Sequence, residues 1–359
     1  MKINAIDIGF GFTKATNGKD FNIFKSIMGE AMDFHIPVNI LTDDIADWLH
    51  IMLDGQNYFV GDFAEQQSNA RHFTLDQEKF VADFARVLAL TALGRLNDEY
   101  IPINLVSGLP VGFYRNYHRR LANTLAGSHE ITFQMSNGSK EIRRLNIDKV
   151  KIIPQPLGSL LNLIMNDKGA IVNGELARQK VGVIDIGFRT TDFCIFHELR
   201  YVERGSTTTN TGLSKCFGLV ANKLQEECGS VNIELYRMYK AIQTGIIRIR
   251  GKEFNIAKLR DLTFANAARV IADDMDRLWV DDWDMDTIIV TGGGATELAK
   301  HLQPLIVGNV IPIKHNVDLR LSNVEGYLKY GRFLWGGAAA KPAAENTRNA
   351  QKKAPASNA

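Results

Sequence analysis

Short runs of apolar, mostly β-branched residues recur along the chain and end in aspartate and glycine, a pattern typical of buried strands that turn tightly. Two of these runs lead into nearly the same motif. Residues 3–6 precede DIGFGFTK at 7–14, and residues 181–184 precede DIGFRTTD at 185–192. Each copy predicts a strand that ends in a carboxylate and a glycine turn. One copy lies in each half of the chain, so we expect two related halves.

Strands and helices are predicted to alternate through the rest of the chain. The hairpin composition of 17–20 (NGKD) indicates an antiparallel opening. Further strands are expected at 103–106, where Ser107 and Gly108 would end the strand, and at 150–153, 287–290 and 306–313. Apolar residues at three- and four-residue spacing predict helices over 80–93, 114–125, 157–165, 215–228, 262–278, 296–301 and 323–335. This alternation favours the α/β class.

Composition sets the size and the surroundings of the protein. With 359 residues, 45% hydrophobic and 23% charged, the chain is long enough for two ordinary cores. The net charge of +2 gives no general attraction to polyanions, so we expect neither direct sequence-specific nucleic acid binding nor direct membrane binding. Cys194, Cys216 and Cys228 lack metal-ligand spacing and are expected to be reduced thiols. No leader-like or membrane-spanning stretch is apparent, so a cytoplasmic location is expected.

The two repeated motifs do not fit the common phosphate-binding fingerprints. A GxGxxG fingerprint beginning at Gly9 would need glycine in place of Lys14, and Asp7 would adjoin the pyrophosphate. No P-loop, GxSxG or HExxH motif occurs. The remaining interpretation is a phosphate pocket made by two glycine-turned hairpins that face each other across a cleft. Asp7 and Asp185 would hold Mg²⁺ through water, because this ion keeps several waters and takes one or two carboxylates.

Five motifs, in order and across nearly the whole chain, resemble those of the actin-like ATPase superfamily, which includes actins, sugar kinases and DnaK-type chaperones. Within it, the chain most resembles ParM-type plasmid-segregation proteins and archaeal actin-like proteins. The two phosphate motifs are matched by 7–14 and 185–192, the two connecting motifs by 154–160 and 323–331, and the adenosine motif by 291–295.

The resemblance implies a fold and a domain division. The fold would be α/β, with two related domains of the actin (ribonuclease-H-like) type flanking a nucleotide cleft. Domain I would comprise 1–156, with a small subdomain inserted at about 21–73, and would be completed by 321–336. Domain II would comprise 157–320. The aperiodic stretch 337–359, rich in alanine, lysine and asparagine, predicts a disordered tail.

The resemblance also implies which residues form the site. Glycine N–H groups would approach the phosphates beside hydroxyl groups and one lysine, and a glycine run would let adenine and ribose lie against the backbone. Arg189, bulkier than the family pattern, is a candidate for contact with the γ-phosphate. The implied nucleotide-binding residues are Gly9, Gly11, Thr13, Lys14, Gly187, Arg189, Thr190, Thr191, Gly292, Gly293 and Gly294. The implied catalytic residues are Gln155, at the position of the glutamine that orients water in actins, with Asp7 and Asp185.

The implied function is an ATPase that binds Mg-ATP and polymerises head to tail into filaments, for plasmid segregation or intracellular positioning. GTP is an alternative nucleotide, and an adaptor protein would link the filament to DNA or other cargo. A small-molecule kinase stays open, although the amide of Gln155 cannot act as a base at neutral pH. A non-polymerising adaptor or chaperone also stays open, although a DnaK-type chaperone would need a long peptide-binding domain after the closing helix.

Overall fold

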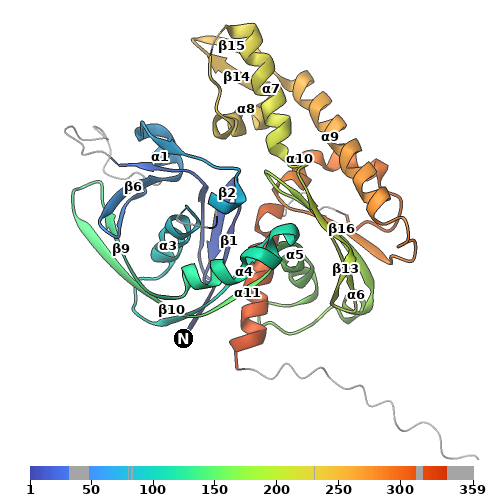
Figure 1. Cartoon of the computed structure of the whole chain (residues 1–359), viewed down its shortest axis with the longest axis horizontal. Helices are drawn as coiled ribbons and strands as arrows, with labels where there is room; N and C mark the ends of the chain where they lie inside the picture. The colour runs from blue at the N-terminus through green and yellow to red at the C-terminus, as the bar shows by residue number, and fades with distance from the viewer. Residues whose placement is uncertain (32–47, 80, 82–83, 230, 313–317, 338–359) are drawn as a thin grey trace, which may run out of the picture.

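The computed structural model describes residues 1–31, 48–79, 81, 84–229, 231–312 and 318–337. Figure 1 shows two lobes, one drawn from blue to green and the other from green to orange, with the last helix running between them. The stretch expected to be a disordered tail lies outside the described residues, apart from Gly337. No helix in the described part of the chain is both long and apolar enough to cross a membrane.

The first lobe is built on a sheet of ten described strands in the order β3-β2-β1-β8-β10-β9-β5-β6-β4-β7. Strands β1, β2 and β3 form an antiparallel meander, whereas β8 runs parallel to both β1 and β10. The strands are β1 (Lys2–Ile8), β2 (Phe12–Thr16), β3 (Phe21–Lys25), β4 (Met28–Glu30), β5 (His50–Leu53), β6 (Gln56–Val60), β7 (Arg71–His72), β8 (Pro102–Leu109), β9 (Gly127–Gln134) and β10 (Lys140–Pro154).

The second lobe repeats the first half of this plan in a four-stranded sheet of order β13-β12-β11-β16. Here β11, β12 and β13 form the antiparallel meander and β16 pairs parallel to β11. The strands are β11 (Lys180–Ile186), β12 (Thr191–His197), β13 (Arg200–Thr209) and β16 (Thr287–Thr291), and a separate hairpin consists of β14 (Ile246–Ile249) and β15 (Lys252–Asn255). The shared strand order bears out the two related halves expected from the repeated motif.

Helices cover the sheets and connect them. They are α1 (Gly61–Gln67), α2 (Gln77–Lys79), α3 (Ala85–Leu96), α4 (Val111–Leu125), α5 (Gln155–Ile164), α6 (Gly174–Arg178), α7 (Leu213–Cys228), α8 (Met238–Thr244), α9 (Ala257–Leu278), α10 (Gly293–Leu302) and α11 (Ser322–Trp335). Each lobe has its own buried cluster of apolar side chains. A third cluster joins α5 and α11 to residues of both sheets, so this helix pair ties the lobes together.

The helices α5 and α11 approach very closely because glycines meet where they cross. A Cβ atom at Gly326 would lie 1.8 Å from the carbonyl oxygen of Gly158. A Cβ at Gly158 would lie 2.5 Å from the ring of Tyr327, which is fully buried. The backbone contact positions the first turns of both helices beside the ends of β1 and β11.

Several predicted elements differ from the structure at their ends. The strand expected to stop at Ser107 continues to Leu109, because β10 pairs with β8 through Gly108 and Leu109. The prediction of a strand within 306–313 is wrong for the described residues 306–312. These form only a single-residue bridge, between Val310 and Ile288. The expected subdomain at 21–73 contributes strands to the large sheet, and residues 32–47 of it lie outside the described residues.

Candidate functional site

A cleft of about 670 Å³ lies where the two lobes meet. Both copies of the repeated motif contribute to its walls, and the first residue of α5, the turn between β16 and α10, and the start of α11 complete it. The predicted site residues that line it are Asp7, Gly9, Gly11, Lys14, Gln155, Asp185, Gly187, Arg189, Thr190, Gly292, Gly293 and Gly294. Most residues predicted from the sequence therefore converge on one cleft.

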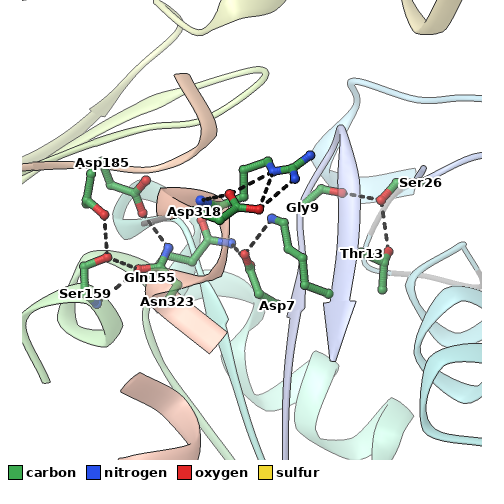
Figure 2. Close-up of polar contacts among 12 residues, drawn as sticks. Asp7, Gly9, Thr13, Ser26, Gln155, Ser159, Asp185, Asp318 and Asn323 are labelled. Atoms are coloured by element: carbon green, nitrogen blue, oxygen red, sulfur yellow. Dashed lines mark hydrogen bonds and ion pairs between the residues drawn. The ribbon is translucent and has the colours of Figure 1, made fainter. Parts of the chain in front are cut away.

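Asp7 is the first fixed charge of the cleft. It stands near the end of β1, directly across the hairpin from Lys14 on β2, and Lys14 Nζ lies 2.8 Å from Asp7 Oδ2. The other oxygen accepts a hydrogen bond of 3.1 Å from Nε2 of Gln155 (Figure 2). Because both carboxylate oxygens have donors, the carboxylate is held in one orientation, and the amide of Gln155 is held beside it.

Asp185 occupies the matching place near the end of β11. Its Oδ2 accepts a hydrogen bond of 2.7 Å from Nδ2 of Asn323, on the first turn of α11 (Figure 2). The oxygen of that amide accepts from Ser159 on α5, whose hydroxyl lies 2.8 Å from that of Thr291 at the end of β16. Asp185 is thus oriented by three elements that come together only in the folded protein.

The electrostatics of Asp185 reflect its burial. Removal from water raises the pKa of this carboxyl to about 6, the hydrogen bond from Asn323 opposes the rise, and the negative charge of Asp7 adds to it. Two acids thus approach closely enough to repel each other. A bound cation would relieve that repulsion.

Magnesium fits this pair of acids. Within the part of the chain that the structure describes, no three or more histidine, cysteine, aspartate or glutamate side chains cluster as a metal site. Asp7 and Asp185 are nevertheless both buried and both line the cleft. Two such oxygen donors match the way Mg²⁺ is usually held, by one or two carboxylates together with water and phosphate oxygens.

The glycines of the two hairpins shape the turns. Gly9 N donates to the carbonyl of Phe12 at 3.1 Å, and Gly187 N donates to that of Thr190 at 2.8 Å. These two N–H groups, expected to approach the phosphates, are therefore engaged inside the turns. The same pairing at both loops gives the two hairpins the same shape.

The glycine run after β16 is needed for close packing against Asp185. Gly292 has φ +89°, and a Cβ there would lie 2.2 Å from Oδ1 of Asp185. A Cβ at Gly294 would lie 2.5 Å from the side chain of Ile186. Side chains at these positions would push the turn away from the end of β11. The glycines therefore let the turn pack closely against Asp185, and they leave their backbone atoms exposed in the wall of the cleft.

Two predicted hydroxyl residues do not line the cleft. Thr13 is fully buried behind the first hairpin, where its hydroxyl lies 3.0 Å from that of Ser26, which in turn donates to the carbonyl of Gly9 (Figure 2). Thr191 is fully buried behind the second hairpin, with its hydroxyl 3.4 Å from the carbonyl oxygen of Thr211. Both residues therefore stabilise the hairpins from behind through hydrogen bonds and do not face the cleft.

Phe188 and Arg189, the two bulky residues of the second hairpin, take different environments. Phe188 packs among aromatic rings, with centroids 5.2 Å from Tyr239 and 5.3 Å from Phe217. The Arg189 guanidinium lies 4.9 Å from the ring centre of Phe10 on the first hairpin. Burial lowers the pKa of Arg189, with Asp76 opposing, and one of its nitrogens is buried without a hydrogen-bond partner. Arg189 thus lines the cleft with unused donor capacity.

Sequence reasoning missed the polar residues that complete the site. Asn323 and Ser159 orient Asp185, and Asp318 accepts hydrogen bonds from Arg320 at the side of the cleft near Gly293. Asn323 opens the closing helix within a matched connecting motif, which was a usable signal. Ser159 also lies within a matched connecting motif, at 154–160, whereas Arg320 lies outside the five motifs and carried no such signal.

The chain matches two protein-family models. Residues 5–158 match the N-terminal domain of actin-like proteins, and residues 183–304 match the C-terminal domain of the archaeal MreB-like actin homologue. The chain belongs to the actin-like proteins. No curated protein matches it in sequence.

Solved structures of actin-like proteins have the same fold. A 15-stranded ParM filament from Clostridium botulinum gives a TM-score of 0.77 at 23% identity, covering 92% of this chain and 99% of that one. An archaeal actin homologue in complex with ADP gives 0.74 at 19% identity, with 91% and 98% covered. Bacillus thuringiensis ParM with ATP gives 0.67 at 19% identity, with 91% and 97% covered.

Proposed function

We propose that this actin-like protein is an ATPase that binds Mg-ATP in the cleft and forms nucleotide-dependent filaments. The observation that carries the proposal is the pairing of Asp7, held by Lys14 and Gln155, with Asp185, held by Asn323, in one cleft. Two oriented acids with an adjacent lysine and amide suit a nucleotide whose phosphates and metal lie between the hairpins.

The residues have distinct proposed roles. Lys14 would place a positive charge against the phosphates while orienting Asp7. The amide of Gln155 would hold the attacking water, since its Nε2 is fixed by Asp7 and its oxygen can accept from water. Mg²⁺, when bound, would neutralise charge on the phosphate oxygens. Gly292, Gly293 and Gly294 would let the nucleoside lie along the backbone.

The named relatives support this proposal in two respects. The archaeal actin homologue was solved with ADP and the Bacillus thuringiensis ParM with ATP, which supports an adenine nucleotide here. The Clostridium botulinum ParM forms a filament, which supports self-association. We further propose that this protein is cytoplasmic and acts in plasmid segregation or intracellular positioning, with an adaptor protein that links the filament to DNA or other cargo.

Calorimetry tests the binding step. Parental protein should bind Mg-ATP, whereas Asp7→Ala and Asp185→Ala should bind it at least about tenfold more weakly, because each loses a charge that fixes the hydrated metal. Asp98→Ala is a matched control, because that aspartate is exposed in the first lobe, away from the cleft. Unchanged affinity in both cleft variants would contradict the proposed site.

Light scattering and pelleting test assembly. Scattering should rise with ATP above a threshold protein concentration. If it stays flat while ATP is hydrolysed, and an added sugar or carboxylic acid accelerates turnover, the protein is a small-molecule kinase instead. If it stays flat without such acceleration, the filament part of the proposal fails while nucleotide binding stands.

A further inference from the structure

Two surfaces of opposite charge lie at opposite ends of helix α9. The hairpin β14–β15 ends at Asn255, directly before α9 begins, and the loop 279–286 follows directly after α9 ends (Figure 1). Residues 237–260 contain seven lysines and arginines and one acidic residue, whereas residues 273–286 contain seven aspartates and one arginine. We name these surfaces the basic hairpin (246–258) and the acidic loop (279–286).

The acidic loop presents a large aromatic side chain to solvent. Trp283 is 88% exposed and Val280 is 71% exposed, with the exposed carboxylates of Asp281 and Asp284 beside them. Exposure of such apolar area to water is unfavourable relative to its burial. Trp and Arg are also the residues most enriched among those that dominate binding energy at protein interfaces.

The loop that carries Trp283 is anchored to the sheet of the second lobe. The carboxylate of Asp282 is buried and forms ion pairs with Lys180 Nζ at 2.9 Å and Arg204 Nη2 at 2.6 Å. Trp279 is buried and donates from its ring nitrogen to the carbonyl of Gly205 at 2.8 Å. After Trp283, the backbone N–H of Asp286 donates to the carbonyl of Lys180 at 2.9 Å. Because residues before and after Trp283 are anchored to the sheet, its outward position is a built feature of the loop.

The basic hairpin has matching chemistry. Arg250 and Gly251 form its tight turn, with φ +49° and +82°. Arg248, Arg250 and Lys252 are exposed, and Ile246 at the other end of the hairpin is 48% exposed. Guanidinium groups beside an exposed aliphatic side chain suit an aromatic ring flanked by carboxylates, since Arg binds both ring faces and carboxylates.

The geometry favours a second copy of this chain as the partner. Helix α9 has 22 residues, so about 33 Å of rigid helix separates the two surfaces. Both belong to the second lobe, whose core includes residues of α9 and of the hairpin. When the loop of one copy meets the hairpin of the next, each outer end keeps a free surface, so the contact repeats without closing.

We propose that the acidic loop of one subunit docks on the basic hairpin of the next, with Trp283 at the centre of the contact. The inference rests on the proposed filament function and specifies the contact that builds it. The surfaces lie outside the residues that line the cleft, so their variants separate assembly from nucleotide binding.

Two variants test the contact from its two sides. The loop variant carries Trp283→Ala and Asp281→Asn. The hairpin variant carries Arg250→Asp and Lys252→Glu, and Asp is chosen at 250 because it tolerates positive φ in such turns. Each should raise the critical concentration for ATP-dependent pelleting by about tenfold or more while leaving ATP affinity unchanged. The matched control Tyr100→Ala with Asp98→Asn alters an exposed aromatic and an exposed aspartate of the first lobe, and should pellet like the parent.

Mixing the two variants identifies the partner. The hairpin variant keeps an intact loop and the loop variant keeps an intact hairpin, so with ATP the mixture should form a one-to-one dimer in sedimentation velocity and should not extend further. A mixture that stays monomeric, or variants that pellet like the parent, would overturn the inference and assign the exposed Trp283 to another protein. If the parent binds ATP but does not assemble, the filament proposal itself fails together with this contact.

Discussion

Gln155 stands between a buried carboxylate and the open cleft, and its replacement separates binding from chemistry. Gln155→Ala should leave ATP affinity nearly unchanged, because the amide donates a hydrogen bond to Asp7 and its proposed role is to hold water, not the phosphates. Hydrolysis should slow by roughly ten- to a thousand-fold, about 1.4 to 4 kcal/mol of transition-state positioning. Phosphate release and calorimetry on the same preparations measure the two effects.

Gln155→Glu is the informative companion. A carboxylate can also hold water but cannot donate to Asp7, so we expect activity between those of the alanine variant and the parent. An alanine variant that hydrolyses ATP at the parental rate would show that another group places the water, with Arg189 and Thr190 the next residues to test.

Asp192 gives the apo protein a pH-dependent stability. Burial raises the pKa of this carboxyl to about 7, and the charge of Asp185 adds to the rise, whereas hydrogen bonds from the hydroxyl of Thr208 and from Val111 N at 2.9 Å oppose it. Between about pH 4 and 7 the folded state keeps a proton that the unfolded chain releases. Stability from this group is therefore present at low pH and is lost as the pH rises through 7.

Asp192→Asn tests this dependence, because the amide cannot titrate. Between pH 5 and 8 the free energy of unfolding of the parent should fall relative to that of the variant, by at most roughly 3 kcal/mol at 1.4 kcal/mol per pKa unit. Urea titrations at several pH values measure it, with Asp98→Asn as the exposed control. Parallel pH profiles for parent and variant would contradict the assignment.

At the residue scale, site residues could be predicted best where the residue type and the local backbone pattern both indicated them. Asp7 and Asp185 could be predicted because each ends an apolar run and precedes a glycine turn. Thr13 and Thr191 belong to the same motifs, yet their side chains are buried on the side of the hairpins that faces away from the cleft. Asn323 orients Asp185 from 138 residues away, a contact that no local pattern encodes.

At the scale of elements, the crossing of α5 and α11 is the contact most sensitive to added volume. Gly326→Ala should destabilise the protein by about 1 to 3 kcal/mol or more, because the new methyl group would collide with the carbonyl of Gly158. Gly218→Ala on α7 is the matched control, since a Cβ there meets nothing within 4 Å. Alanine at that position should instead stabilise the helix by up to about 1 kcal/mol.

Denaturant midpoints of the two variants measure the difference. Equal midpoints for Gly326→Ala and the parent would mean that the helices can separate without cost. The ATP affinity of Gly326→Ala should also fall, because the first turn of α11 carries Asn323.

Long helices with apolar residues at three- and four-residue spacing could be predicted from the sequence, whereas polar strands could not. Helices α7, α9 and α11 lie where their periodicity predicted them, apart from their first residues. The first half of β10 is mostly polar and partly exposed, so its pattern did not separate it from a loop. It is a strand because β9 pairs with it, and pairing partners are set by the tertiary fold.

At the scale of the whole molecule, the proposed contact between the two ends of α9 should make assembly sensitive to ionic strength. Raising salt from about 50 to 500 mM shortens the screening length to a few ångströms, so the critical concentration of the parent should rise. Asp281→Asn should show a weaker dependence, because one of the opposing charges is already absent. Pelleting at saturating Mg-ATP measures both, and identical salt dependence would argue against charge pairing between subunits.

The two-lobed plan was predictable at this scale because five motifs occur in order along the chain. The relation of the lobes was not, since it depends on α5 and α11 crossing at backbone contact and on a third apolar cluster shared by both sheets.

The position of α11 in the chain has a consequence for synthesis. Strands β1 and β8 of the first lobe pack against α11, yet the ribosome makes the whole of the second lobe before it makes that helix. A growing chain can therefore contain both Asp7 and Asp185 while it still lacks Asn323, the residue that orients Asp185. Nascent chains crowded on one messenger RNA would be poor nucleotide binders until α11 has been made and has packed between the lobes, and the proposed assembly would admit only chains in which it has.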